Sequence, residues 1–200
     1  MIISQKLKYV FLEVPKTGTR SIDKILIKYF YGKETKGHGY ILNKRYKNYF
    51  KFMVIRNPYS RIVSTWWSTT QRGKDRYNWI KEAKGKSDLE TILKLFINSK
   101  IKHKINHAEK QKCYYDAGVN KILRFEYLEK DFNTLPFIKE YIKLPKLNKT
   151  YNKRKSYCYY MNDKIIKIIN DYYKEDFKIG NYKIYKNKKE MMKDIQNESI

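Results

Sequence analysis

Hydrophobic residues occur along this chain in two patterns, and each pattern predicts a different kind of element. Continuous apolar runs at 9–14, 50–55 and 121–125 have the length and composition of buried strands. Elsewhere apolar residues recur every three or four positions, which predicts helices over 21–31, from 58, from 87, over 127–141 and from 162. Strands that alternate with helices indicate a central parallel sheet flanked by helices. The predicted fold class is therefore α/β.

Polar and turn-forming residues mark where these elements begin and end. Pro58 suits the first position of a helix, Ser87–Glu90 has the pattern of a capping box, and Asn162 is a typical N-cap. The stretches 71–86 and 144–156 are predicted to be irregular. No repeat or linker divides the chain. We therefore expect one domain over 1–185, followed by a polar, frayed tail over 186–200.

The charge of the chain favours an anionic partner without identifying it. The 200 residues include 45 Lys and Arg against 20 Asp and Glu, which gives a formal net charge of +25. Such a charge suits a nucleotide, nucleic acid, an acidic glycan or a membrane surface. A bias toward A/T-rich codons accounts for the lysines equally well, because Lys, Asn, Ile and Tyr are all abundant. The charge alone therefore decides nothing.

The cysteines and the apolar runs indicate where the protein works. Cys113 and Cys158 lack metal-ligand spacing, and a reducing compartment is the simpler assumption for two cysteines. No apolar run reaches the about 18–20 residues that a membrane-spanning helix needs. The N-terminus lacks the apolar centre and cleavage site of a signal peptide. We expect a soluble, cytoplasmic protein without a metal site or a membrane span.

The first predicted strand leads into a loop that suits a phosphate-like group. Residues 15–21 read Pro-Lys-Thr-Gly-Thr-Arg-Ser and connect a strand to a helix. Backbone N–H groups in such a turn form a concave anion site, to which the helix N-terminus adds positive potential. The loop is not G-x-x-x-x-G-K-[ST], because Glu13 replaces the first glycine and Lys16 precedes Gly18. An ordinary strand-to-helix turn with a solvated lysine remains the alternative.

The second predicted strand also ends in a basic residue. Arg56 follows the strand directly, and Arg61 and Ser64 lie one turn apart on the next helix, where a guanidinium and a hydroxyl can bind a second phosphate. Phosphoryl-transfer enzymes place an acidic residue at such a strand end to hold Mg²⁺, whereas residues 50–70 contain none. The sequence therefore predicts a site for two phosphate-like groups and no metal.

These residues resemble the sulfotransferases that use 3′-phosphoadenosine 5′-phosphosulfate, especially their carbohydrate branch. That family's first loop reads P-K-[TAGS]-[GS]-[ST], matched here by residues 15–19, and its second reads R-[DN]-P-x-x-R-x-x-S-x-[YW], matched by residues 56–66. Weaker likeness continues through 107–111, 123–132, 144–148 and 172–182. The resemblance implies a P-loop-NTPase-like sulfotransferase fold that transfers a sulfuryl group from this nucleotide to a hydroxyl acceptor, with a glycan favoured and no specific nucleic acid.

The resemblance also implies roles for individual residues. Lys16 would act in catalysis beside the bridging oxygen, and His38, flanked by glycines, would be the catalytic base. Relatives with this base sometimes carry a second histidine two residues earlier, where this chain has Lys36. His107 is interpreted as structural or acceptor-side, and Glu126 as a residue that holds neighbouring loops. The nucleotide-binding residues would be Pro15, Lys16, Thr17, Gly18, Thr19, Arg20 and Ser21 for the 5′-phosphosulfate, Arg56 and Ser64 for the 3′-phosphate, and Lys153, Arg154 and Lys155 in a covering loop.

Other functions stay open at this point. The run 153–155 is equally well a solvated group of charges. A kinase with a degenerate loop, a basic nucleic-acid-binding module and a sulfotransferase fold that only binds acidic glycans are the alternatives.

Overall fold

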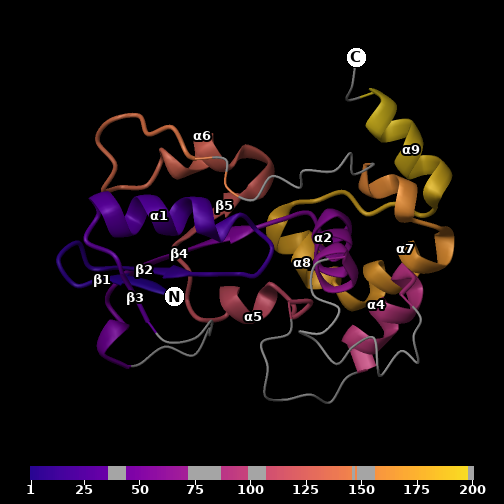
Figure 1. The fold of residues 1–200 in the computed structure, drawn as a ribbon, viewed down its shortest axis with the longest axis horizontal. Coiled ribbons are helices and arrows are strands. Elements are labelled where there is room, and N and C mark those ends of the chain that lie inside the picture. The colour runs from indigo at the N-terminus through magenta and orange to yellow at the C-terminus, as the bar shows by residue number, and fades with distance from the viewer. Residues whose placement is uncertain (36–43, 72–86, 99–106, 146, 148–155, 198–200) are drawn as a thin grey trace. The chain divides into compact units, whose positions relative to one another are not determined.

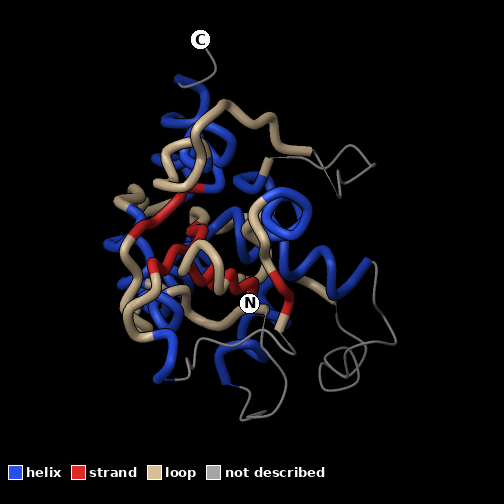
Figure 2. Tube along the Cα trace, turned by 90° about the vertical axis from the view of Figure 1, so that its left-hand side faces the viewer, coloured by secondary structure: helices blue, strands red, loops and turns tan. Residues whose placement is uncertain are grey.

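The computed structural model describes residues 1–35, 44–71, 87–98, 107–145, 147 and 156–197, and Figures 1 and 2 draw the other residues in grey. Contacts divide the chain into two compact units. The first unit comprises Met1–Arg56 and Lys110–Tyr151, and the second comprises Asn57–Glu109 and Asn152–Ile200. Because the chain passes between them three times, no single boundary separates them in the sequence. The single domain over 1–185 stays a prediction.

The first unit contains a mixed five-stranded sheet with the order β3-β1-β2-β4-β5, whose strands are red in Figure 2. Strands β2, β4 and β5 run parallel, with Leu12 opposite Met53 and Ile55 opposite Arg124. Strand β1 pairs antiparallel with both β2 and β3. The strands are β1 (Ile2–Ser4), β2 (Tyr9–Leu12), β3 (Lys33–Glu34), β4 (Phe50–Ile55) and β5 (Lys121–Arg124).

The predicted α/β class is confirmed, and the three predicted strands form the parallel part of the sheet. The two antiparallel strands are additional. They contain three and two residues, too few for a hydrophobic period to appear in the sequence.

The core of the first unit lies between the sheet and helix α1 (Thr19–Tyr29), which Figure 1 shows along one side of the strands. Ile22, Ile25 and Leu26 follow helical spacing and pack with Tyr9 and Phe11. The short helices of this unit are η1 (Lys44–Tyr46), α5 (Lys112–Tyr115), η2 (Phe125–Tyr127) and α6 (Leu128–Phe132).

The prediction of one helix over 127–141 is wrong beyond Phe132. Helix α6 ends there, and Asn133 turns the chain back. Its side-chain amide accepts from the N–H of Ile142 at 2.7 Å and donates to the carbonyl of Ile142 at 2.9 Å. These bonds span nine residues, and Pro136, which lies inside the predicted range, also disfavours a continuous helix there.

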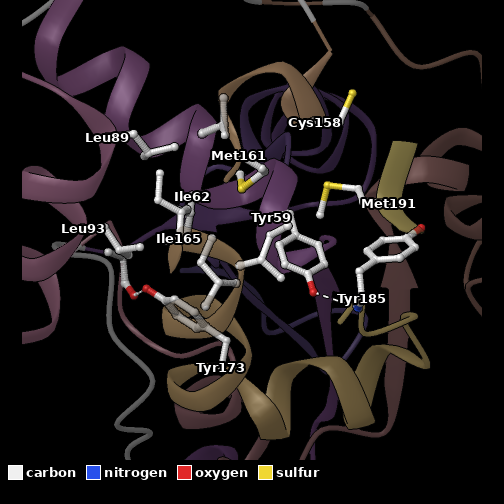
Figure 3. Close-up of a cluster of buried hydrophobic side chains, with 14 of the residues drawn as sticks. Tyr59, Ile62, Leu89, Leu93, Cys158, Met161, Ile165, Tyr173, Tyr185 and Met191 are labelled. Carbon is white, nitrogen blue, oxygen red and sulfur yellow. Dashed lines mark hydrogen bonds between the residues drawn. The ribbon is translucent and has the colours of Figure 1, made fainter. Parts of the chain in front are cut away.

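The second unit is helical and has its own hydrophobic core (Figure 3). Tyr59 lies within this core, donates to Asn170 at 2.5 Å and accepts from the backbone N–H of Tyr185 at 3.1 Å. Met191 is fully buried in the same cluster. The elements are α2 (Pro58–Gln71), α4 (Leu89–Asn98), η3 (Tyr157–Tyr160), α7 (Asp163–Tyr172), α8 (Lys174–Gly180) and α9 (Lys188–Asn197).

The helix starts in this unit agree with the sequence at two helices and differ at a third. Helix α2 begins at Pro58 as predicted, with Asn57 accepting from the N–H of Tyr59, and Asn162 caps α7 as predicted by accepting from the N–H of Ile165. At α4, however, the cap is Asp88 rather than Ser87, because the Asp88 carboxylate accepts from the N–H of Thr91. The capping box predicted with Ser87 and Glu90 is therefore wrong: an N-cap bond at Asp88 replaces it, and the Glu90 carboxylate pairs with Lys94 and Lys164.

The polar tail predicted to fray instead forms helix α9 over Lys188–Asn197. Met191 anchors it in the core, and Asn187 and Glu190 satisfy backbone N–H groups at its start. In the described ranges, no helix combines the length and the apolar character that crossing a membrane requires.

Candidate functional site

The carboxyl ends of three neighbouring parallel strands meet in the first unit. Strand β2 leads into the loop with Lys16, β4 is followed by Arg56, and β5 by Phe125. The Arg56 guanidinium donates through Nη1 to the carbonyl oxygen of Lys16 at 3.0 Å. Its central carbon lies 4.1 Å from the centroid of the Phe125 ring. The Arg56 side chain therefore contacts both neighbouring strand ends, through the Lys16 backbone and the Phe125 ring, at the edge where ligands bind in open α/β sheets.

The loop itself has the backbone form of an anion site. Lys16 and Gly18 have φ angles of 69° and 80°, in the left-handed region. Left-handed residues in a short loop turn backbone N–H groups to one side. Gly18 precedes α1 without a side-chain cap hydrogen bond, and no acidic residue lies in the first turn. The first N–H groups of a helix have no acceptor within the helix and carry positive potential, so this end favours an anion.

The hydroxyl of Thr17 forms a hydrogen bond within the loop. Thr17 is fully buried, and its Oγ1 donates to the carbonyl oxygen of Val14 at 2.8 Å. This bond closes the turn after β2. The Thr17 hydroxyl proton is therefore used within the loop, and the role of Thr17 toward the nucleotide stays a prediction.

Gly18 fits where a larger residue would collide. A Cβ atom at this position would lie 3.1 Å from Cε2 of Phe125 and 3.1 Å from Cδ2 of Leu128. The loop thus packs directly on the residues that follow β5. Only glycine combines the positive φ with this close approach.

Two residues of this region carry no local signal in the sequence. One is Phe125, which supports the guanidinium of Arg56. The other is Gln111, which is fully buried. Its Nε2 donates to the carbonyl of Arg56 at 2.9 Å, and its Oε1 accepts from the N–H of Arg56 at 2.9 Å. Gln111 belongs to the segment 107–111 that carries part of the family likeness, which was its only signal.

Arg61 is a structural residue of the second unit, contrary to the hypothesis that its guanidinium binds a phosphate. It is fully buried. Its Nη2 donates to the carbonyls of His107 at 3.1 Å and Glu109 at 2.5 Å, and its Nη1 lies 3.9 Å from the carboxylate of Asp176. A guanidinium held by these groups inside the unit is not available to a ligand. His107 contributes its backbone to this network.

The other predicted site residues differ in their exposure. Pro15 and Ser21 are buried in the first unit, Lys16, Thr19 and Arg56 are partly exposed, and Arg20 and Glu126 are exposed. Ser64 is partly exposed on α2 of the second unit. His38, Lys153, Arg154 and Lys155 lie outside the described residues. Within those residues, no group of three or more His, Cys, Asp or Glu side chains could hold a metal ion.

A pair of carboxyl groups lies where β2 meets α1. Glu13 is 3% exposed and forms an ion pair with the amino group of Met1. Burial raises the pKa of Asp23 from 3.8 to about 8. The charge of Glu13, a hydrogen bond to Glu13 and the charge of Glu34 also raise this pKa, whereas the positive charge of the Met1 amino group lowers it. The folded protein therefore keeps a proton on Asp23 that the unfolded chain loses above pH 3.8. This group's contribution to stability is complete below that pH and is lost as the pH rises toward about 8.

A strand-end loop that favours anions, with an arginine from the next strand beside it, is typical of enzymes that transfer anionic groups. Comparison with protein families gives the class: the profile described as "Sulfotransferase family" matches residues 1–183. The chain belongs to the sulfotransferase family, and its class of reaction is sulfuryl transfer. Comparisons with curated proteins and with solved structures found no match.

Proposed function

We propose that this protein transfers a sulfuryl group from 3′-phosphoadenosine 5′-phosphosulfate to a hydroxyl group of a carbohydrate. The observation that carries the proposal is the hydrogen bond of 3.0 Å from Arg56 to the carbonyl of Lys16. It joins one residue from each of the two motifs that the family uses for the two ends of this nucleotide. The family match over residues 1–183 supports the same reading and disfavours the kinase alternative.

The residues of the loop fit the 5′ end of the nucleotide. The backbone N–H groups at the start of α1 and the ammonium group of Lys16 suit a singly or doubly charged anion, and no carboxylate lies in the first turn to oppose it. When bound, the nucleotide supplies an activated sulfuryl group. Lys16 would hold positive charge beside the bridging oxygen, where negative charge develops as the S–O bond breaks.

The remaining roles are carried over from the sequence. Arg56 would bind the 3′-phosphate with Ser64, and Lys153–Lys155 would cover the nucleotide. His38 would accept the proton of the attacking hydroxyl. A glycan is favoured as the acceptor because His38 resembles the base of enzymes that sulfate uronic acids, and because the formal charge of +25 suits acidic polymers.

A thermal-shift comparison of three nucleotides tests the donor. Adenosine 3′,5′-bisphosphate should raise the unfolding temperature by mass action, whereas AMP and ATP with Mg²⁺ should do so far less. Equal shifts from all three would contradict a site for the 3′-phosphate. Incubation with the phosphosulfate donor and a panel of glycans then tests transfer. Binding to mixed DNA without any response to the donor would instead favour the nucleic-acid-binding alternative.

A substitution at Arg56 tests the placement of the 3′-phosphate. Arg56→Ala should weaken bisphosphate binding by about 2–4 kcal/mol, because a charge-assisted contact to a partly desolvated phosphate is lost. Arg124→Ala is a matched control, since Arg124 is the last residue of β5 and also lies over an aromatic ring, at 4.6 Å from the centroid of Tyr127. Unchanged bisphosphate binding in Arg56→Ala would mean that the phosphate lies elsewhere.

A further inference from the structure

The Gln111 side chain forms hydrogen bonds with the backbone of Arg56 just beyond the point where the pairing of β4 with β5 ends. The last registered pair of β4 with β5 is Ile55 with Arg124, so Arg56 lies one residue beyond the ladder. An N–H and a C=O at such a position need other partners when they are buried. The amide of Gln111 bonds to both, at 2.9 Å each, as a neighbouring strand would.

The same two bonds fix the direction of the Arg56 side chain. They hold the N–H and the carbonyl on either side of the Arg56 Cα, and so fix the position from which the side chain starts. Only the side-chain torsions then determine where the guanidinium lies. The guanidinium then lies on Phe125 and donates to the carbonyl of Lys16. Gln111 is itself fully buried, so it has little freedom to move away from this arrangement.

We propose that Gln111 is a positioning residue that gives the site its preference for a 3′-phosphorylated nucleotide, acting through Arg56. The inference rests on the proposed function, since it requires Arg56 to bind the 3′-phosphate. Gln111 makes no contact with the nucleotide in this arrangement. It holds Arg56 within the small displacement that a bidentate contact to phosphate tolerates.

The measurement is the ratio of two affinities, for adenosine 3′,5′-bisphosphate and for AMP, by titration calorimetry on the full chain. Gln111→Met keeps the length of the side chain and removes both hydrogen bonds. It should weaken bisphosphate binding ~10- to 100-fold, the loss expected when a hydrogen bond between charged groups is weakened or broken. AMP lacks the 3′-phosphate, so its affinity should change little, and the ratio should fall.

Asn120→Ala is the matched control. The Asn120 side chain accepts from the N–H of Lys51 at 2.8 Å, and its backbone N–H donates to the carbonyl of Lys51 at 2.8 Å. It thus supports the same strand, β4, at the opposite end from Arg56. Asn120→Ala should leave the ratio at the wild-type value. If Gln111→Met does not fold, Gln111→Glu replaces it, because a carboxylate keeps the acceptor for the Arg56 N–H and loses the donor to its carbonyl.

Coupling to Arg56 separates positioning from a general structural role. In an Arg56→Ala background, Gln111→Met should not lower bisphosphate affinity further, because the group it positions is gone. Equal losses for both nucleotides, an unchanged ratio, or losses that add to those of Arg56→Ala would each overturn the inference. If Arg56→Ala alone keeps the wild-type ratio, the 3′-phosphate placement fails and this inference with it. If Arg56→Ala loses the ratio and Gln111→Met keeps it, only the role of Gln111 fails.

Discussion

Replacing Gly18 with alanine tests whether the loop after β2 depends on its contact with the residues after β5. Gly18 has a φ of 80°, and a Cβ there would lie 3.1 Å from both Phe125 and Leu128. Two separate costs follow. The left-handed backbone is strained for any residue with a Cβ, and the added methyl group enters space that two side chains already occupy.

The magnitude follows from adding the two costs. A left-handed conformation costs a residue with a Cβ about 1–2 kcal/mol. Overpacking adds about 1–3 kcal/mol, so Gly18→Ala should lower the free energy of unfolding by roughly 2–5 kcal/mol. Gly118 has nearly the same φ, 81°, and a Cβ at that position would meet nothing within 4 Å. Gly118→Ala should therefore cost only the first part, about 1–2 kcal/mol.

Urea unfolding of the two variants and the wild type measures both costs, provided that the slopes of the transitions agree. The difference between the two glycine substitutions isolates the packing cost. A third comparison adds Leu128→Ala, which removes one of the two crowding side chains, so Gly18→Ala should cost less in that background. Equal destabilisation by Gly18→Ala and Gly118→Ala would refute the close packing of the loop on Phe125 and Leu128.

Three further predictions concern the chemistry, the second unit and the carboxyl pair. Lys16→Ala should lower turnover strongly and nucleotide affinity moderately, whereas His38→Ala should leave bisphosphate binding intact and lower turnover ~10²–10⁴-fold; near-full activity of His38→Ala would place the base elsewhere. Arg61→Ala should destabilise the protein by about 3–5 kcal/mol in urea unfolding, because it leaves the buried Asp176 carboxylate without its ion pair; a loss below about 1 kcal/mol, the level of a surface pair, would contradict this burial. Because folding raises the pKa of Asp23 to about 8, stability should fall between pH 5 and 8, and Asp23→Asn, which cannot ionise, should reduce that fall. The control Asp116→Asn, at an exposed residue, should leave the fall in stability unchanged. An equal dependence of stability on pH in Asp23→Asn and the wild type would contradict the shifted pKa.

Local patterns in the sequence were enough to predict the central strands and several helix starts. The run 50–55 is strand β4 with both ends as predicted, and Asn162 caps α7 as predicted. These features depend on residues that are close in the sequence, because the spacing of hydrophobic residues and the capping side chain determine them. The missed strands depend on pairing between segments, since β1 pairs with β2 and β3 pairs with β1. The helix predicted over 127–141 ends where Asn133 bonds to Ile142, and there Pro136 was a local signal that the hydrophobic spacing concealed.

The motifs pointed to the candidate site but did not show which of their side chains face it. Spacing placed Arg61 and Ser64 one turn apart, yet spacing does not reveal that Arg61 points into the second unit, toward carbonyls 46 and 48 residues away. Gln111 reaches Arg56 over 55 residues of sequence. Neither contact follows from helical or strand periodicity, because each depends on how separate segments pack.

The second motif therefore contains two arginines with different tasks, one in each unit. Arg56 belongs to the first unit, is partly exposed, and has its guanidinium against the loop of Lys16. Arg61 belongs to the second unit, is fully buried, and contacts the carbonyls of His107 and Glu109 and the carboxylate of Asp176 within that unit. Both look alike in the sequence, but their loss should be read in different assays. A change at Arg56 should appear in the affinity for a 3′-phosphorylated nucleotide with little change in stability, and a change at Arg61 should appear first in stability. A matched motif can thus contain residues that stabilise the fold and residues that bind the ligand. The burial of each residue distinguishes the two kinds.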